Sequence, residues 1–287
     1  MTRREIKELS VEFRCSLKIV SQSLGKSRGW LYYKHRTRVR MPVIKRPDVV
    51  EGIREVIREK PVSYGYRRVH ALLRVRGIYC NSKTVNRYMA QRLWLSSYRE
   101  RRKRGERRHE GVVAVEEPNR RWASDITVIK AWNGEKGRFA VLIDCGDRQI
   151  LSYRWGKRIT GYDIQEMVIE ALKKRFGSDR IPEEGIEFLS DNGPEYIKTT
   201  LKRFLENVGF VVCRTPIKSP ESNGIAESFF RGFKRDYVYQ SECESFDAVC
   251  RMIDGWVEDY NQKAPHGALG MLTPAKFYEK WKLESDG

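Results

Sequence analysis

The sequence has 287 residues, of which 56 are Lys or Arg and 38 are Asp or Glu, so its formal net charge is +18. Apolar residues make up 40% of the chain, which is enough to bury a sizeable core and excludes a disordered tail, a collagen-like fibre and a mini-protein. The longest apolar stretches, such as residues 139–143, are far too short to cross a bilayer, and the N-terminal segment is polar and charged. We therefore expect neither a membrane span nor a signal peptide.

The positions of the cysteines and histidines argue against disulfides and a structural zinc site. Six cysteines are widely scattered, and four histidines form no pairs at the spacing of zinc ligands. This pattern indicates reduced thiols, a cytoplasmic protein and no structural zinc.

The positive charge is confined to the first part of the chain. Residues 1–110 contain 30 Lys or Arg and 10 Asp or Glu, a net charge of +20, whereas the other 177 residues contain 26 and 28, a net charge of −2. A strongly basic N-terminal region, joined to a region with almost no net charge, indicates a module that binds a polyanion by electrostatic attraction. Nucleic acid is the commonest polyanion for such a module. A solvated basic surface is the alternative for any single patch, but it does not account for an excess of this size.

Two helical units are predicted in this basic part. Residues 16–35 have the pattern of a helix, a glycine turn and a second helix. In the second unit, apolar residues recur at helical spacing from Tyr66 up to Gly77, a C-terminal stop, and Ser82 is expected to cap the next helix. The outer face of that helix carries Lys83, Thr84, Asn86 and Arg87. Such side chains reach phosphates and base edges in the major groove, although a helical hairpin with an ordinary charged face has the same pattern.

Two linkers are also predicted, over residues 37–47 and 98–111. Six of the eight residues from 101 to 108 are basic, beginning with Arg101, Arg102, Lys103 and Arg104. Such a run is typical of a flexible arm that becomes ordered on the phosphate backbone of a nucleic acid. A nuclear localisation signal is the competing interpretation.

From Arg121 onward the pattern indicates strands alternating with helices. Three strands are predicted over residues 122–130, 137–145 and 149–155, with Asn133-Gly134 in the first hairpin turn. The later elements are a helix over 162–176, a strand over 185–191, a helix over 195–208, a strand over 210–213 and a helix over 221–239. Antiparallel strands followed by this alternation imply an α/β fold with a mixed sheet covered by helices.

Three acidic residues in this half are candidates for a site. Asp125 lies in the middle of the first strand, where a carboxylate is costly unless it is paired or binds a cation. Asp191 ends the fourth strand, where the chain must turn. Glu227 lies on the long helix, and Arg231 and Lys234 project within about 40° of it.

Three carboxylates brought together by a sheet and a helix would repel one another unless hard cations lay between them. Two Mg²⁺ ions, with Mn²⁺ as a substitute, would take oxygen ligands from the carboxylates and leave positions for phosphate oxygens. The corresponding chemistry is in-line displacement at phosphorus. Taken singly, each acid is equally well explained as a surface or capping residue, so the convergence is an expectation from the predicted topology.

Several motifs match a known family. Asp191 and Glu227 have 35 residues between them, and Lys234 follows Glu227 by seven. With Asp125, this spacing resembles the Asp-Asp-Glu set of the transposase and retroviral integrase superfamily, whose catalytic domain is ribonuclease H-like. Further sequence motifs lie around these acids, at residues 64–69, 119–125, 190–193, 219–228, 260–262, 265–270 and 273–274. They are similar to the second-frame protein of the bacterial insertion-sequence-three family, and residues 144–148 and 225–229 favour its insertion-sequence-two-like branch.

The resemblance implies a fold, an activity and roles for the acids. Asp125, Asp191 and Glu227 would bind the metal pair, and Lys234 would contact DNA near them. The implied reaction is cleavage at one element end, transfer of the 3′-hydroxyl to the other end, and insertion at a target. Because the start of the chain has no sustained heptad repeat, we expect it to be the second frame alone.

The implied domain organisation joins a helical region to a catalytic core. Residues 1–40 would form a helix-turn-helix-like segment, 48–96 a helix-turn-helix-type DNA-binding domain, 97–117 a basic linker and 118–280 a ribonuclease H-like, integrase-type domain with a mixed five-stranded sheet. The expected DNA contacts are Lys234, Arg231, Arg67, Arg68, Lys83, Thr84, Asn86, Arg87, Arg101, Arg102, Lys103 and Arg104.

The expected partners are double-stranded DNA of the terminal inverted repeats and of the target, further copies of the chain on DNA, and the first-frame protein of the same element. The chain would be nucleoid-associated when it is bound. Two other functions fit the same sequence. One is an accessory or regulatory DNA-binding protein that occupies element ends without catalysis, and the other is a ribonuclease H-like nuclease without strand transfer. Outside the site, Trp122, Trp155 and Trp256 are expected to pack in the core, and His266 to fix a turn.

Overall fold

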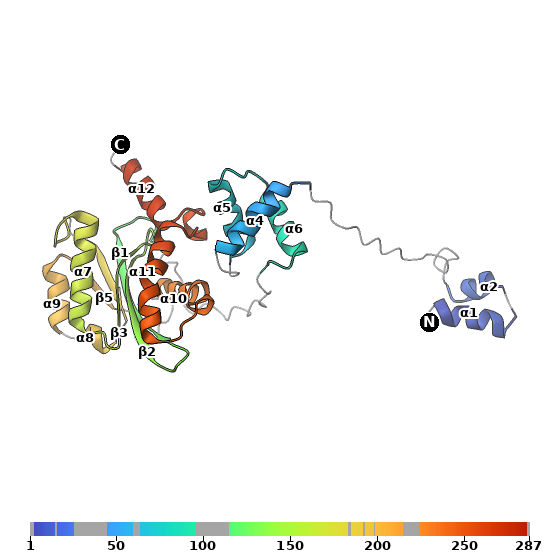
Figure 1. Cartoon of the computed structure of the whole chain (residues 1–287), viewed down its shortest axis with the longest axis horizontal. Coiled ribbons are helices and arrows are strands. Elements are labelled where there is room, and N and C mark those ends of the chain that lie inside the picture. Colours follow the sequence, from blue (N-terminus) through green and yellow to red (C-terminus); the bar gives the residue numbers. More distant parts are fainter. Residues whose placement is uncertain are drawn as a thin grey trace. The chain divides into compact units, whose positions relative to one another are not determined.

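The structure is a computed structural model, and it describes residues 3–14, 16–25, 45–59, 64–95, 115–182, 185–191, 193–197, 199–214 and 224–285. The chain divides into two units, Met1–Lys45 and Arg46–Gly287 (Figure 1). The first unit contains α1 (Arg3–Glu12), which was not predicted, and α2 (Leu17–Ser23), which matches the first helix predicted after residue 16. The second predicted helix, residues 37–44 of the linker predicted over 37–47, and the basic run over 101–108 lie outside the described residues. The last residue of that predicted linker, Pro47, is already helical.

The second unit begins with three helices, α4 (Pro47–Glu59), α5 (Tyr66–Val75) and α6 (Ser82–Gln91). They bury a small apolar core to which each helix contributes, including Ile53, Leu73 and Met89. The N-cap prediction at Ser82 was wrong by one position. Asn81 is the cap, because its backbone is extended and its side-chain oxygen accepts a 2.8 Å hydrogen bond from the amide of Lys83.

A five-stranded sheet follows, with strand order β3-β2-β1-β4-β5. Its strands are β1 (Arg121–Lys130), β2 (Lys136–Asp144), β3 (Ile150–Gly156), β4 (Glu187–Ser190) and β5 (Val211–Arg214). β1, β2 and β3 pair antiparallel, whereas β1, β4 and β5 pair parallel. The predicted α/β class with a mixed sheet is confirmed, and so is the hairpin turn, in which Gly134 has a φ of 89°.

Helices cover both faces of the sheet (Figure 1). α7 (Gly161–Phe176), α8 (Pro194–Ile197) and α9 (Thr199–Asn207) pack on the face of Trp122 and Leu142. α10 (Gly224–Asp236) and α11 (Phe246–Gln262) pack on the face of Ala123 and Val141. Alternate residues of each strand therefore face different helices. No helix in the described ranges is long and apolar enough to span a membrane.

The C-terminal part departs most from the sequence-based expectation. The helix predicted over 221–239 ends at Asp236, and residues 238–240 form a 3₁₀ turn, because Tyr237 leaves the helical backbone region and buries its ring against α11. α11 and α12 (Pro274–Ser285) were not predicted. His266 does fix a turn, since its amide donates to the carbonyl of Leu272. Trp122 and Trp256 are buried, and Trp155 is half-buried against Phe246.

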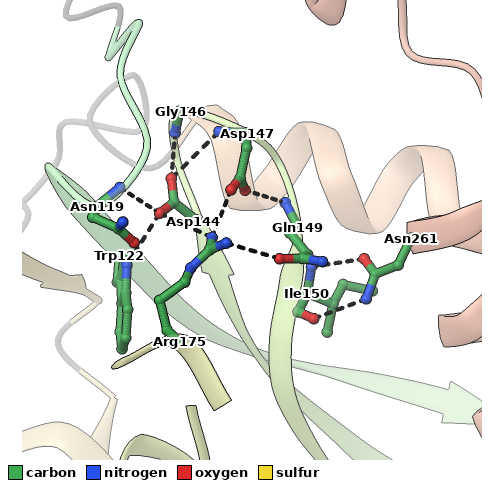
Figure 2. Close-up of polar contacts among 9 residues, drawn as sticks. All are labelled: Asn119, Trp122, Asp144, Gly146, Asp147, Gln149, Ile150, Arg175 and Asn261. Atoms are coloured by element: carbon green, nitrogen blue, oxygen red, sulfur yellow. Dashed lines mark hydrogen bonds and ion pairs between the residues drawn. The ribbon is translucent and has the colours of Figure 1, made fainter. Parts of the chain in front are cut away.

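A buried polar network joins the β2–β3 turn to α7 (Figure 2). Asp144 and Asp147 are fully buried, and Arg175 of α7 contacts both, at 3.4 Å and 2.5 Å. Asp144 also accepts hydrogen bonds from the indole nitrogen of Trp122 and from the backbone amides of Asn119 and Gly146. The network therefore fixes the end of the sheet at which β1 begins.

The C-terminal helices are attached at the same end of the sheet. The side chain of Asn261 in α11 bonds both the amide and the carbonyl of Ile150, each at 2.9 Å (Figure 2). The guanidinium of Arg175 lies 3.7 Å from the ring centroid of Tyr278 in α12.

Candidate active site

Asp125 and Asp191 lie on neighbouring parallel strands. β1 and β4 pair in register up to Ser124 opposite Ser190, and each aspartate is the next residue along its chain. Ala123 and Leu189, two residues earlier, both belong to the core beneath α10 and α11. Because side chains alternate along a strand, Asp125 and Asp191 are directed to the same side of the sheet.

Both aspartates are held by backbone amides. The Oδ1 atom of Asp125 accepts a 2.7 Å hydrogen bond from the amide of Ile126, and Oδ1 of Asp191 accepts one of 2.9 Å from the amide of Gly193. A Cβ atom on Gly193 would lie 3.0 Å from Oδ1 of Asp191, so a side chain there would crowd the carboxylate. Gly193 thus shapes the turn that presents Asp191, whereas Asn192 lies outside the described residues.

The helix that carries Glu227 crosses the same face of the sheet. Lys234 of α10 donates a 2.7 Å hydrogen bond to the hydroxyl of Thr127, which follows Asp125 by two residues and shares its side of β1. Partial burial lowers the pKa of Lys234. Glu227 lies two helical turns before Lys234, and its side chain lies outside the described part of the chain. Among the described side chains, no group of three or more His, Cys, Asp or Glu could hold a metal ion.

Further residues that were not predicted from the sequence lie on and next to the strands of the two aspartates. The Ser124 and Tyr196 hydroxyls share a 2.8 Å hydrogen bond on the opposite side of β1, and burial raises the pKa of Tyr196. The nearly buried carboxylate of Glu195 pairs with Arg138 of β2 at 2.5 Å. The acid four residues after Asp191 was the one signal in the sequence that could have drawn attention to this layer.

The predicted DNA-binding residues fall into two groups. On α6, Lys83 and Arg87 are exposed, Thr84 and Asn86 are half-buried, and the opposite face fills the three-helix core. On α5, Arg67 is exposed, whereas Arg68 forms a 2.6 Å ion pair with Asp236 at the end of α10. Arg231 is exposed on α10. Residues Arg101, Arg102, Lys103 and Arg104 lie outside the described ranges.

Comparison with family models agrees with this geometry. Two models, each described as an integrase core domain, match residues 115–220 and 212–274. A model described as an HTH-like domain matches residues 45–102. Together with the mixed sheet, these matches define a protein with an integrase-type, ribonuclease H-like core that follows a helix-turn-helix-like domain.

Two curated relatives identify the family. The transposase InsD for insertion element IS2A/D/F/H/I/K of Escherichia coli is 37% identical over 239 residues, which cover 80% of this chain and 78% of the relative. An uncharacterized protein of insertion element IS136 from Agrobacterium fabrum is 42% identical over 173 residues, which cover 60% of this chain and 88% of the relative. The chain belongs to the insertion-sequence-three family of insertion-element transposases, in the branch of IS2. Polynucleotidyl transfer is the activity that this family indicates.

A solved structure has the same fold. A chain of the simian T-cell lymphotropic virus intasome, solved by cryo-electron microscopy in complex with PP2A regulatory subunit B56 gamma, is similar with a TM-score of 0.50 and 16% identity. The similarity covers 79% of this chain and 74% of the intasome chain.

Proposed function

We propose that this transposase cleaves and joins DNA strands with Asp125, Asp191 and Glu227 as its catalytic set. The observation that carries the proposal is the pairing of β1 with β4, which sets Asp125 and Asp191 on neighbouring strands and on the side of the sheet that α10 covers. The hydrogen bond between Lys234 and Thr127 supports a position for Glu227 on that same side.

The donor set fits hard divalent cations. Carboxylate oxygens are the ligands that Mg²⁺ prefers, and two ions held by the three acids, with Mn²⁺ as a substitute, would activate the attacking oxygen and stabilise the leaving one. The protein holds Asp125 and Asp191 through backbone amides, so the carboxylates keep their orientation without the ions. Glu195 is already paired with Arg138 and is not a member of the proposed set.

Basic side chains around this set would position the DNA. Lys234 and Arg231 lie on the same stripe of α10 as Glu227, where they would contact phosphates next to the reacting bond. The exposed residues of α6, with Arg67 and the basic run over 101–104, would bind the terminal inverted repeats of the element. Target DNA, further copies of the chain and the first-frame protein complete the proposed assembly.

Strand transfer by the full chain tests the proposal. The substrate is a labelled duplex with the terminal sequence of the element that encodes the chain, incubated with target DNA and Mg²⁺. Each of Asp125→Asn, Asp191→Asn and Glu227→Gln is expected to abolish cleavage and joining while leaving duplex binding intact. Asp179→Asn, an exposed change of the same kind, is the control. Normal activity in any of the three variants removes that residue from the mechanism.

The same assay separates the alternative functions. An accessory protein would bind element ends, and the wild-type chain would leave them uncut with Mg²⁺ and with Mn²⁺. A nuclease would cut them, but labelled 3′-ends would never become joined to target DNA.

A further inference from the structure

A cavity of about 570 Å³ lies where α5 meets α10. Its wall contains four arginines, Arg68, Arg148, Arg231 and Arg235. They come from three parts of the chain, since Arg68 belongs to α5, Arg148 to the β2–β3 turn, and Arg231 and Arg235 to α10. The fold therefore gathers cations that are far apart in sequence.

One buried carboxylate organises two of these arginines. Asp236 is 5% exposed and accepts hydrogen bonds from Arg68, at 2.6 Å, and from Arg235, at 2.6 and 2.8 Å. Burial raises the pKa of Asp236, but the bonds from Arg235 and Arg68 outweigh it, so that the pKa lies below its ordinary value. An acid at the C-terminal end of a helix is unfavourable with the helix dipole, which is consistent with a specific role in holding the arginines.

The cavity keeps an excess of positive charge. Asp236 is the one carboxylate among the described residues that line it, against four guanidinium groups. Neither Arg148 nor Arg231 forms a salt bridge with a carboxylate in the described ranges. A set of this composition favours an anion, and the planar fork of donors on arginine matches phosphate oxygens.

The imidazole of His266 also lies on the cavity wall. Its Nε2 atom is buried, and in the described structure it has no hydrogen-bond partner. Burial, with a further contribution from the charge of Arg68, lowers the pKa of His266 to about 4, so the ring is neutral at neutral pH. In a neutral ring that donates one hydrogen bond to the backbone of Tyr260, the Nε2 atom is an acceptor, so His266 reports on the cavity and is not itself a ligand for phosphate.

We propose that this cavity binds a phosphodiester group of the DNA strand that leads to the candidate active site. Arg148 and Arg235 would contact the phosphate, and Asp236 would position Arg68 and Arg235 for it. The inference rests on the proposed function, because it takes DNA as the polyanion. α10 links the two sites, since Arg231 lines the cavity and also lies on the face of α10 that carries Glu227 and Lys234.

The test compares Arg148→Ala with Arg203→Ala in the full chain. Arg148 forms no described ion pair, so its loss should leave the melting temperature unchanged, and Arg203 is an exposed arginine of α9. Binding to a duplex with the element's terminal sequence is measured by fluorescence anisotropy over a series of salt concentrations. Arg148→Ala is expected to weaken binding about tenfold and to reduce the slope of log affinity against log salt by about one. Arg203→Ala should change neither, and Arg148→Lys should keep the slope because it keeps the charge.

A second measurement is independent of DNA and of catalysis. Titration of the full chain with inorganic phosphate should shift the imidazole resonances of His266, and the shift should disappear in the double variant Arg148→Ala/Arg235→Ala.

The two proposals can fail separately. Unchanged affinity and salt slope in Arg148→Ala, together with normal strand transfer by the wild-type chain, overturn the cavity proposal alone. A wild-type chain that neither cleaves nor joins DNA, but whose binding still depends on Arg148, overturns the catalytic proposal alone.

Discussion

Lys234 of α10 donates a hydrogen bond to the hydroxyl of Thr127 in β1, across 2.7 Å. Thr127 lies two residues after Asp125 on the same side of the strand, and Lys234 lies two helical turns after Glu227. One bond between two side chains therefore helps to set the helix that carries one candidate carboxylate against the strand that carries another.

Removing the acceptor should loosen this connection. In Thr127→Val, the ammonium of Lys234 loses its partner while the volume of the side chain is nearly kept. We expect the free energy of unfolding to fall by about 1 kcal/mol, as for a partly exposed hydrogen bond to a charged group, and strand joining to slow. Urea denaturation measures the first effect. Thr127→Ser keeps the hydroxyl and should behave like the wild type, and equal losses in both variants would show that the bond contributes nothing.

The hydrogen bond between Ser124 and Tyr196 supports the other side of the same strand. Tyr196→Phe leaves the buried hydroxyl of Ser124 without this partner, which should lower the free energy of unfolding by about 1–3 kcal/mol. The double variant Ser124→Ala/Tyr196→Phe removes both polar groups and should lose less than the sum of the two single variants. Denaturant unfolding of all four proteins measures the coupling, and additive losses would contradict it.

Gly137 is required by a close approach of Trp155. The six-membered ring of Trp155 on β3 occupies the space that a Cβ atom at residue 137 would need. Gly137→Ala should therefore lower the free energy of unfolding by about 1–3 kcal/mol. Gly255→Ala in α11 is the matched control, because no atom lies within 4 Å of its added Cβ and alanine should stabilise the helix by about 1 kcal/mol. Recovery of stability in Gly137→Ala/Trp155→Leu would identify the ring as the cause.

The sequence predicts the parts of the site that depend on local pattern. The alternation of apolar residues locates β1 and its isolated Asp125, and the turn-forming residues after Ser190 locate Asp191. Register is different, because the pairing of Ser124 with Ser190 joins residues far apart in the chain and depends on the packing of both sheet faces.

Long-range polar contacts could not be predicted from the sequence either. The ion pair of Arg68 with Asp236 spans 168 positions, and neither residue stands out in a chain with 33% charged residues. The helix α11 was missed although Val249, Ile253, Trp256, Val257 and Tyr260 recur at helical spacing, because the interpretation of that region rested on the family motifs alone. The cap at Asn81 was missed because Asn and Ser, which are neighbours here, are both good N-cap residues.

The network of Asp144, Asp147 and Arg175 should make stability depend on pH. Burial raises the pKa of Asp147 to about 7, with a further contribution from the charge of Asp144, although Arg175 opposes the shift. Because the folded protein holds this proton more tightly than the unfolded chain, whose carboxyl has a pKa near 3.8, the contribution to stability is present below about pH 4. It is lost as the pH rises to about 7 and beyond, where two buried carboxylates share one guanidinium.

Asp147→Asn tests this pH dependence. The amide of the variant is neutral and does not titrate, so no buried charge appears at residue 147 as the pH rises. The melting temperature of the variant should therefore increase relative to that of the wild type as the pH is raised from about 4 to about 7. Asp179→Asn makes the same change in charge at an exposed position and should follow the wild type. Thermal unfolding monitored by circular dichroism across this range measures the effect, and parallel curves for wild type and Asp147→Asn would show that the buried pair does not hold an extra proton.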